Sequence, residues 1–442
     1  MSLESTVLAK IKPTAEEMEK IDHAAEALKK AVEDYVKSHG IEAEARFVGS
    51  YAKGTYLSDP DLDLFLLFPE TATPKELETA GISAGEAVMG KIERMYSEHP
   101  YARGIYEGIE VDLVPSYAIK TTDKLRTSVD RTPFHTTYIA NNIKEEQKDE
   151  VRLLKKFMKG IGVYGAEPNT RGFSGYLCEL LVLHYGSFLK VLEGASGWKE
   201  GTTIAFGNIR GPPMIGSLIV YDPVDIRRNV ASAVHIDTMA LFIIASKAYL
   251  SSPSEKFFFP LDRVPLSREE LQKISDRNGS RIITVVFNRP NINEENLYSQ
   301  LWKTRYALTK KLNDFDYNVL KAVQDMYPNN LEIAFELERD VLSKTYKHAG
   351  PPVWVKAADS FQAKWKNNPF GQPFIEDGCW NVIAERLYFT AKEMLEDEAA
   401  VAGIGREIDP RNMKIRDHET SLNETNRLLL TELLDPKNSW EI

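Results

Sequence analysis

The sequence contains very little cysteine and no long apolar run. Only Cys178 and Cys379 occur among its 442 residues, far apart and in no CxxC arrangement. This excludes a cysteine-based zinc site and favours a reducing, intracellular setting. No apolar stretch approaches the roughly 20 residues that a membrane-spanning helix requires. The first residues also lack the charged-then-apolar order of a signal peptide, so we expect a cytoplasmic protein with no membrane partner.

An excess of positive charge is missing as well. The formal net charge is −10, which is awkward for a protein that binds nucleic acid, although phosphate binding depends on local fields rather than on the total. One candidate cationic face lies between Val341 and Asn368, where Asp359 is the only acid. Its basic and aromatic residues are Lys344, Lys347, Lys356, Lys364, Lys366, Tyr346, Trp354, Phe361 and Trp365. An RNA-binding face and an ordinary solvated helix face explain this stretch equally well.

What is present indicates a folded protein of two to four domains. The chain is 43% hydrophobic and 27% charged, and its length exceeds one ordinary core. Over the first 140 residues helices alternate with strands, and Thr14 with Glu17 forms a plausible capping box. The expected elements are a helix over 14–40, strands over 45–48 and 61–68, a helix over 74–96, and a hairpin of 103–107 with 109–114 about Gly108. This order predicts an α/β head.

The pattern turns helical after residue 144. Expected helical segments are 151–160, 173–192 and 231–249, followed by a linker over 251–265 that is rich in Ser, Pro and Phe. The order strand, helix, two strands, helix and strand then predicts a ferredoxin-like unit, which is common among RNA-binding modules. Its expected elements are 281–287, 296–312, 317–324, 331–337, 356–367 and 380–387. The remainder from residue 390 is charged and mostly helical.

Three aspartates carry the clearest chemical signal. Asp61 and Asp63 are two residues apart in a strand, so they project from the same face at a spacing of roughly 6.5–7 Å. Asp112 lies in a second apolar strand. Carboxylates that converge in a buried setting need a cation or must raise their pKa values. Such a trio suits two hard divalent cations roughly 3.5–4 Å apart, the arrangement that serves phosphoryl transfer.

A Gly-Ser turn precedes these acids. Gly49 allows the backbone to approach a phosphate closely, Ser50 offers a hydroxyl and an N–H, and Lys53 lies on the first turn of a helix that we expect to begin there. A lone Gly-Ser turn or a lone Asp-x-Asp pair is an ordinary structural feature. The turn and the three acids in this order, each at a strand end, favour a catalytic site.

These motifs resemble the DNA polymerase β-type nucleotidyltransferase superfamily and, more narrowly, the archaeal-type (class I) CCA-adding tRNA nucleotidyltransferases. The likeness covers nearly the whole chain and is strongest in FVGSYAKGTYL, DLDLFLLFPE, SEHPYARG, VDLVPSY, VDRTPFH, VRLLKKFMKGIGVYGAE, RGFSGYLCELL and DPVDIRRNVA. It implies an α+β multidomain fold: a catalytic head (1–140), a helical neck (141–255), a body with the ferredoxin-like unit (256–388) and a mostly helical tail (389–442).

The resemblance also implies roles for single residues. Asp61, Asp63 and Asp112 match metal carboxylates that hold two Mg²⁺ ions, and Asp112 would lie nearest the primer 3′-OH. The implied nucleotide contacts are Gly49, Ser50, Lys53, His135, Lys155, Tyr164 and Arg228, with Arg228 recognising the base edge and His99 near the active site. Some relatives carry Glu in place of Asp61 and Arg in place of Lys53; a lysine there keeps the charge but not a bidentate phosphate contact.

Without the resemblance, four of these residues have equally ordinary interpretations. His135 could be a satisfied core histidine, Lys155 a solvated helix residue, and Tyr164 a packing residue rather than a base-stacking one. Arg228 stands among Asp222, Asp225 and Arg227, so an exposed salt bridge is its default interpretation.

The function that the resemblance implies is template-independent addition and repair of the 3′-terminal CCA of tRNA from CTP and ATP, with release of diphosphate. The expected partners are the tRNA acceptor arm and 3′ end, and a homodimer stays open. Rival interpretations are a poly(A) polymerase or oligoadenylate-synthesising enzyme on the same head, and a non-catalytic RNA-binding scaffold. An antibiotic-modifying transferase would leave roughly 300 residues without a purpose.

Overall fold

A computed structural model describes residues 2–96, 100–207 and 211–442, which form two compact units. The first unit comprises Met1–Leu261 with Ser439–Ile442, and the second comprises Asp262–Asn438. Each unit has its own hydrophobic cores and its own sheets.

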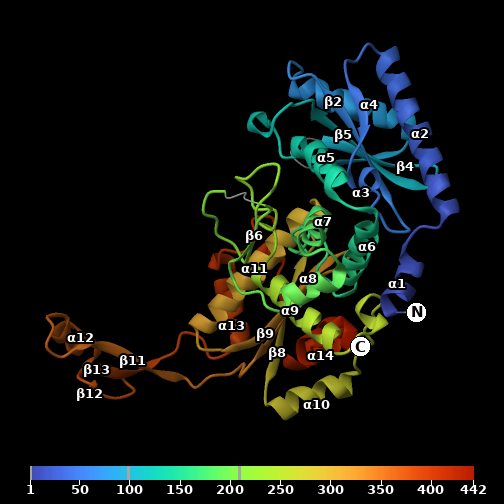
Figure 1. The fold of residues 1–442 in the computed structure, drawn as a ribbon. Coiled ribbons are helices and arrows are strands. Elements are labelled where there is room, and N and C mark those ends of the chain that lie inside the picture. Colours follow the sequence, from blue (N-terminus) through green and yellow to red (C-terminus); the bar gives the residue numbers. More distant parts are fainter. Residues whose placement is uncertain (1, 97–99, 208–210) are drawn as a thin grey trace. The chain divides into compact units, whose positions relative to one another are not determined.

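The head of the first unit is a mixed five-stranded sheet in the order β1-β2-β5-β4-β3. The strands are β1 (Glu44–Phe47), β2 (Asp61–Phe68), β3 (Ile92–Tyr96), β4 (Pro100–Tyr106) and β5 (Ile109–Tyr117). Only β2 and β5 pair in parallel. The helices α2 (Ala15–Ser38) and α4 (Pro74–Met89) cover one face of the sheet (Figure 1), where Leu28, Leu62 and Leu113 belong to one apolar core.

The sequence predicted most of the head correctly. The helix after Thr14 carries the expected capping box with Glu17, and the strand over 61–68 has the predicted bounds. The helix expected over 74–96 is wrong beyond Met89. Gly90 adopts φ +74°, which ends the helix, and β3 then pairs antiparallel with β4 at the sheet edge.

The helical part of the first unit packs around one large apolar cluster. Its helices are α1 (Leu3–Ile11), α5 (Thr132–Asn142), α6 (Glu145–Gly160), α7 (Gly175–Tyr185), α8 (Phe188–Ala195) and α9 (Ile236–Ser251). Phe157 lies at its centre, fully buried, with ring contacts to Phe188, Phe242 and Tyr249. Two short strands, β6 (Thr202–Ile204) and β7 (Leu218–Val220), pair in parallel beside it.

The apolar segment over 173–192 forms two helices instead of one. Gly186 at φ +99° ends α7, and α8 continues at an angle of 91°. In the described part of the chain, α7 and α8 together have the length and apolar composition of a broken membrane span, and no single helix does. The next helix begins at Ile236, five residues later than expected, because residues 231–233 form a turn and His235 is the N-cap.

The second unit contains the predicted ferredoxin-like arrangement. Its four-stranded antiparallel sheet has the order β14-β8-β10-β9, built from β8 (Arg281–Asn288), β9 (Val319–Met326), β10 (Asn330–Leu337) and β14 (Lys414–Arg416). Helices α11 (Glu294–Asp314) and α13 (Ala391–Glu398) complete the βαββαβ order. Three further helices, α10 (Arg268–Asn278), α14 (His418–Glu424) and α15 (Arg427–Leu434), share a smaller apolar cluster in this unit.

The last helix and strand of this order are not the ones we predicted. Helix α12 (Ala357–Trp365) and strand β13 (Cys379–Glu385) belong to a separate sheet with β11 (Thr345–Pro352) and β12 (Phe374–Glu376), inserted between β10 and α13. Figure 1 shows this inserted sheet away from the four-stranded sheet of the same unit. Strand β14 has only three residues and therefore no readable period, whereas β13 shows a clear strand pattern.

The inserted sheet also explains the aromatic residues of the candidate cationic face. Phe361 and Trp365 lie 6.3 Å apart between their ring centroids and both pack against His348. They form the small interior between α12 and β11. Lys347 is paired with Glu376, and Trp354 is 75% exposed. Packing therefore accounts for two of the four aromatic residues, and RNA binding by this stretch stays a prediction.

Candidate active site

The strand register brings two of the predicted aspartates side by side. Asp63 of β2 pairs directly with Asp112 of the parallel neighbour β5, and Asp61 opens β2 two residues earlier. Burial, together with the charges of Asp61 and Asp112, raises the pKa of Asp63 to about 7. The three acids are therefore neighbours that repel one another, as the sequence predicted.

Asp112 already has a counter-ion. Arg103, its antiparallel partner on β4, donates from Nε and Nη2 to the two carboxylate oxygens at 2.7 and 2.8 Å. This pairing raises the pKa of Arg103 above its ordinary value. Among the residues that the structure describes, no three His, Cys, Asp or Glu side chains converge closely enough to enclose a metal ion. Asp63 and Asp112 are thus adjacent, and the Arg103 guanidinium is paired with Asp112.

The residues present nevertheless suit a divalent cation. All the donors are carboxylate oxygens, which hard cations prefer. The nearby cations do not offset the effects that disfavour a charged Asp63. Lys53 and Arg103 lower its pKa less than burial and the other acids raise it. A cation at this place would remove the repulsion among the three acids.

The Gly-Ser turn lies against the same acid. Gly49 begins the short helix α3 (Gly49–Lys53) at φ +67°, and a Cβ built on it would come 1.9 Å from the Oδ2 atom of Asp63. Only glycine allows both this conformation and this approach. The Val48 N–H donates to the Asp63 carbonyl at 3.0 Å, which fixes the turn to β2. Ser50 follows on α3, half-buried.

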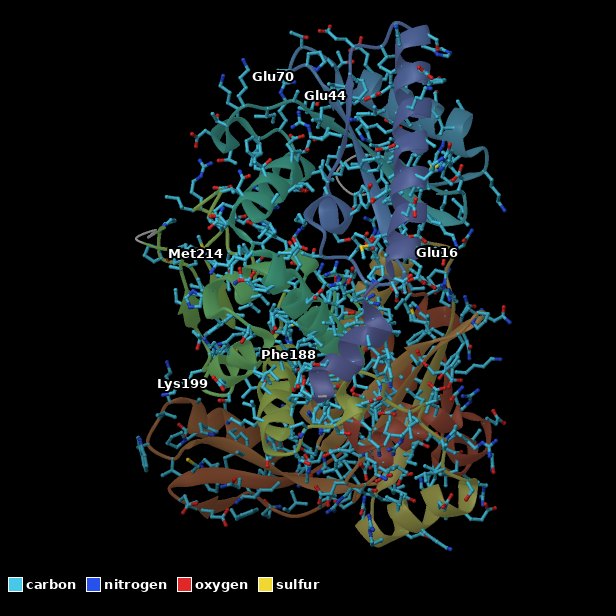
Figure 2. All side chains as sticks on the ribbon, turned by 45° about the vertical axis from the view of Figure 1, so that its right-hand side comes forward. Glu16, Glu44, Glu70, Phe188, Lys199 and Met214 are labelled. Carbon is cyan, nitrogen blue, oxygen red and sulfur yellow. The ribbon has the colours of Figure 1, made fainter. Side chains whose placement is uncertain are left out.

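A cleft of about 1100 Å³ adjoins the first aspartate. Asp61 and Tyr164 line it, together with α2 residues that include Glu16 and Lys20. Figure 2 shows Glu16 at one end of the head and Glu44 with Glu70 at the other. Burial raises the pKa of Tyr164 well above its ordinary value. Tyr164 is half-buried and lines the cleft, so both interpretations of this tyrosine, packing and base stacking, remain consistent with its position.

Two predicted lysines meet in the interior. Lys53 of α3 and Lys155 of α6 are each less than a tenth exposed and both pair with Glu179 of α7, at 2.6 and 3.5 Å. The alternative that Lys155 is a solvated helix residue is therefore wrong. Glu179 was missed in the sequence, although it is the only acid in the otherwise apolar helix α7.

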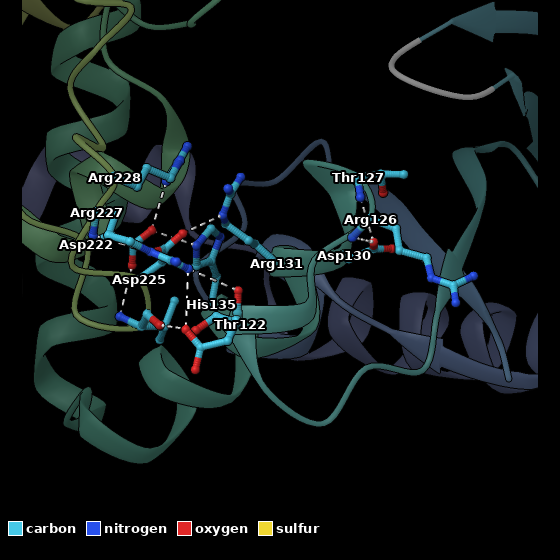
Figure 3. A network of polar contacts seen from close by, with 12 residues as sticks. Thr122, Arg126, Thr127, Asp130, Arg131, His135, Asp222, Asp225, Arg227 and Arg228 are labelled. Atoms are coloured by element: carbon cyan, nitrogen blue, oxygen red, sulfur yellow. Dashed lines mark hydrogen bonds and ion pairs between the residues drawn. The ribbon is translucent and has the colours of Figure 1, made fainter. Parts of the chain in front are cut away.

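The remaining predicted contacts meet at Asp222. This fully buried carboxylate accepts from His135 Nε2 at 2.9 Å, from the Tyr176 hydroxyl at 3.1 Å and from Arg228 Nη1 at 3.0 Å. His135 also stacks on Tyr176, with ring centroids 3.9 Å apart. Burial lowers the pKa of His135, and Asp222 opposes that shift. Figure 3 shows His135 and Arg228 turned toward this acid.

The loop before His135 is fixed by a second buried acid. Asp130 accepts from the Ser116 hydroxyl and from three backbone N–H groups, those of Tyr117, Arg126 and Thr127. Arg131, the next residue, donates to Asp225 at 3.2 Å (Figure 3). These contacts attach the start of α5 to the segment that carries Arg228.

The predicted residues thus form three groups in the first unit: the acids with Gly49, the buried lysines, and the Asp222 cluster. Sequence reasoning missed Arg103 and Glu179. Arg103 had a readable signal, because a two-residue turn at Glu107–Gly108 places it opposite Asp112. His99, expected near the active site, lies outside the described residues.

Three family models match successive stretches of the chain. A nucleotidyltransferase domain matches residues 26–135, a second domain of tRNA nucleotidyltransferases matches 149–259, and a C-terminal domain of CCA-adding enzymes matches 278–417.

Relatives match over most of the length. The CCA-adding enzyme of Methanosarcina barkeri is 38% identical over 417 residues, which cover 92% of this chain and 91% of the relative. That of Methanothermobacter thermautotrophicus is 41% identical over 361 residues, covering 80% and 79%. Among solved structures, the Cid1 poly(U) polymerase aligns with 57% of this chain and 94% of its own at 14% identity and a TM-score of 0.45, a likeness too low to support a conclusion.

Proposed function

The chain belongs to the CCA-adding enzymes, which are tRNA nucleotidyltransferases, and we propose that Asp61, Asp63 and Asp112 form its metal centre. The observation that carries this proposal is the register of β2 and β5, which sets Asp63 beside Asp112 next to the Gly49 turn. The proposed catalytic head covers residues 1–140 and the proposed helical neck covers 141–255.

The proposed reaction is attack of the tRNA 3′-OH on the α-phosphate of CTP or ATP, with release of diphosphate. Two Mg²⁺ ions, when bound, supply Lewis acidity and neutralise phosphate charge. Asp61, Asp63 and Asp112 would hold these ions, and Asp112 would lie nearest the attacking hydroxyl. The missing side chain at Gly49 would let the backbone of the turn approach the triphosphate, and Lys53 would supply positive charge.

The junction of head and neck supplies the other nucleotide contacts in this proposal. Lys155 adds a second positive charge beside Lys53, and Tyr164 borders the cleft next to Asp61. His135 and Arg228 share Asp222, so their donor groups are held in fixed directions. A buried hydrogen-bonding site discriminates strongly, because the wrong base leaves polar groups unpaired.

Unit two would bind the tRNA acceptor arm through shape and backbone contacts. The ferredoxin-like sheet and the inserted sheet supply the candidate surface, including the lysines over 341–368. The cationic stretch supports this proposal despite the net charge of −10, since phosphates respond to local charge. A homodimer stays a prediction.

The test uses tRNA that lacks its 3′ CCA, labelled CTP and ATP, and gel analysis of product length. We expect the protein to add three nucleotides and stop, whereas a poly(A) polymerase would continue. Asp63→Asn and Asp112→Asn should abolish incorporation and leave tRNA binding nearly unchanged. Glu44→Gln is the matched control, because it removes an exposed acid from the far end of the same sheet. Near-normal incorporation by either aspartate variant would refute the metal assignment.

Nucleotide choice provides a separate test. Arg228→Ala removes a donor that Asp222 holds at 3.0 Å. We expect this variant to lose discrimination between CTP and UTP more than it loses total incorporation. Arg227→Ala is the matched control. Arg227 is the preceding residue, its own side chain is 59% exposed, and it pairs with Asp123 and Asp225. An unchanged CTP-to-UTP ratio in Arg228→Ala would count against the assignment.

A further inference from the structure

One fully buried carboxylate joins three segments that are far apart in the sequence. Glu179 of α7 receives hydrogen bonds from Lys53 Nζ at 2.6 Å, from the Thr55 hydroxyl at 2.6 Å and from Lys155 Nζ at 3.5 Å. Lys155 also donates to the Thr55 carbonyl at 3.2 Å. All four residues are less than a tenth exposed. The cluster is therefore a largely buried polar network inside the first unit.

The charges of this network do not cancel. Two ammonium groups share one carboxylate, so one positive charge is left over in a place from which water is largely excluded. Burying a charge is costly unless a partner compensates it. Burial lowers the pKa of Lys155, and the charge of Lys53 lowers it further, while Glu179 opposes both effects. Burial would raise the pKa of Glu179, but the two lysines hold it below its ordinary value.

The groups around the lysines cannot replace this carboxylate. The centroid of the Tyr176 ring lies 6.0 Å from Lys53 Nζ, and the Tyr164 hydroxyl and Lys155 Nζ both lie near Gly175. Cys178, the neighbour of Glu179 on α7, has its pKa raised to about 12 by burial and stays a thiol. Within the described cluster, Glu179 is thus the acid in direct contact with both lysines.

The surplus charge lies near the proposed metal-binding acids. Lys53 lies three residues after Ser50, on the helix that begins at the Gly49 turn, and its charge lowers the pKa of Asp63. An ion pair that served only to fix helices would balance its charges. We propose that Glu179 is a positioning residue that keeps Lys53 and Lys155 charged and directed for the triphosphate of the incoming nucleotide. This inference rests on the proposed function, in which both lysines contact that triphosphate.

The inference makes the pH dependence of nucleotide binding the diagnostic measurement. Without Glu179, one of two adjacent buried ammonium groups loses its proton as the pH rises, and the triphosphate loses a cation. In Glu179→Gln we expect the Kd for CTP, measured by calorimetry without tRNA, to rise about tenfold at pH 8.5, the effect of one lost charged hydrogen bond. At pH 6.5 the rise should be much smaller. The unchanged protein should bind with little pH dependence over this range.

Two variants separate positioning from simple structural support. Glu150→Gln is the matched control: Glu150 lies on α6, as Lys155 does, and its carboxylate accepts a hydrogen bond from the backbone N–H of Phe188 at 2.8 Å. It should alter thermal unfolding without a pH-dependent change in the Kd for CTP. If Glu179→Gln fails to fold, Glu179→Asp keeps the charge on a shorter stem and should raise KM for CTP more than it lowers kcat, with a flat pH profile.

The outcomes are decisive in both directions. A Glu179→Gln protein that is folded and binds CTP with the pH profile of the unchanged protein would overturn the inference, as would a Glu179→Asp protein with normal KM. Lys53→Met and Lys155→Met test the underlying assignment separately. If both lysine variants bind CTP normally, the proposed triphosphate contacts are wrong. If the lysine variants lose CTP binding but Glu179→Gln does not, the proposed role of Glu179 is wrong.

Discussion

Replacing Gly49 by alanine should damage catalysis far more than stability. An alanine at φ +67° costs about 1–2 kcal/mol of backbone strain. Its Cβ would also stand 1.9 Å from the Asp63 carboxylate, where contacts below 3.0 Å essentially do not occur. The carboxylate must therefore move by roughly 1 Å, and a displacement of that size at a reacting centre costs on the order of 100-fold in rate.

Gly40 provides a matched control on the same head. It adopts φ +64°, and a Cβ there would meet nothing within 4 Å. Gly40→Ala should therefore carry the backbone strain without the collision. The melting temperatures of the two variants should fall by similar amounts, roughly 2–4 °C for each kcal/mol. Incorporation of labelled CTP should fall about 100-fold in Gly49→Ala alone. Equal activity in the two variants would refute the argument that Asp63 must keep its present position.

Three further predictions concern the first unit. Phe157→Ala should reduce the free energy of unfolding by about 3–5 kcal/mol, seen in denaturant titrations, because its ring is fully buried among other aromatic residues; a loss below 1 kcal/mol would contradict this packing. Arg103→Gln should tighten Mn²⁺ binding about tenfold in paramagnetic resonance titrations, since a charge-assisted pair no longer competes for Asp112, and unchanged affinity would show that the pair does not compete. Burial lowers the folded-state pKa of His135 below its ordinary value, so the free energy of unfolding should fall as the pH drops from about 6.5. His135→Gln should flatten that part of the curve of unfolding free energy against pH. Parallel curves for the variant and the unchanged protein would contradict this prediction.

The sequence was sufficient for elements whose signals are local. The strand over 61–68 is an apolar run bounded by turn residues, and the helix after Thr14 has a complete capping box. The error after Met89 arose because apolar residues over 92–96 continue the helical spacing of α4. These residues form a strand because they pair with the edge of β4, a tertiary interaction that the local sequence does not show.

The inserted sheet shows a second limit of sequence reasoning. The predicted order of elements was right, but α12 and β13 were assigned to the wrong sheet. Strand partners are chosen across the fold, and local periodicity does not specify them. The strand that completes the ferredoxin-like sheet, β14, has three residues and pairs with β8.

For the site, the sequence showed the proposed acids and the turn in their order along the strands: Gly49 follows β1, Asp61 and Asp63 lie in the first three residues of β2, and Asp112 is the fourth residue of β5. The partners of those residues were harder to predict. Asp222 could be named as a neighbour of Arg228 in the sequence, but its contacts with His135 and Tyr176 depend on the packing of α5 and α7. Glu179 required three distant segments to meet, although a single acid in an apolar helix is itself a signal of a buried partner.

The two missed residues have one role in common. Arg103 places a cation on the proposed metal-binding acids, and Glu179 places an anion on the proposed triphosphate-binding lysines. Arg103 occupies the place of a metal cation, and Glu179 occupies the place of the triphosphate anion. Leaving either set uncompensated would cost stability, because buried like charges repel and lose hydration. In the proposed function, a bound metal ion therefore replaces Arg103 as the partner of the acids, and a bound triphosphate replaces Glu179 as the partner of the lysines. Because both sets of charges are already paired without ligands, the fold can keep a buried catalytic site without depending on its ligands for stability.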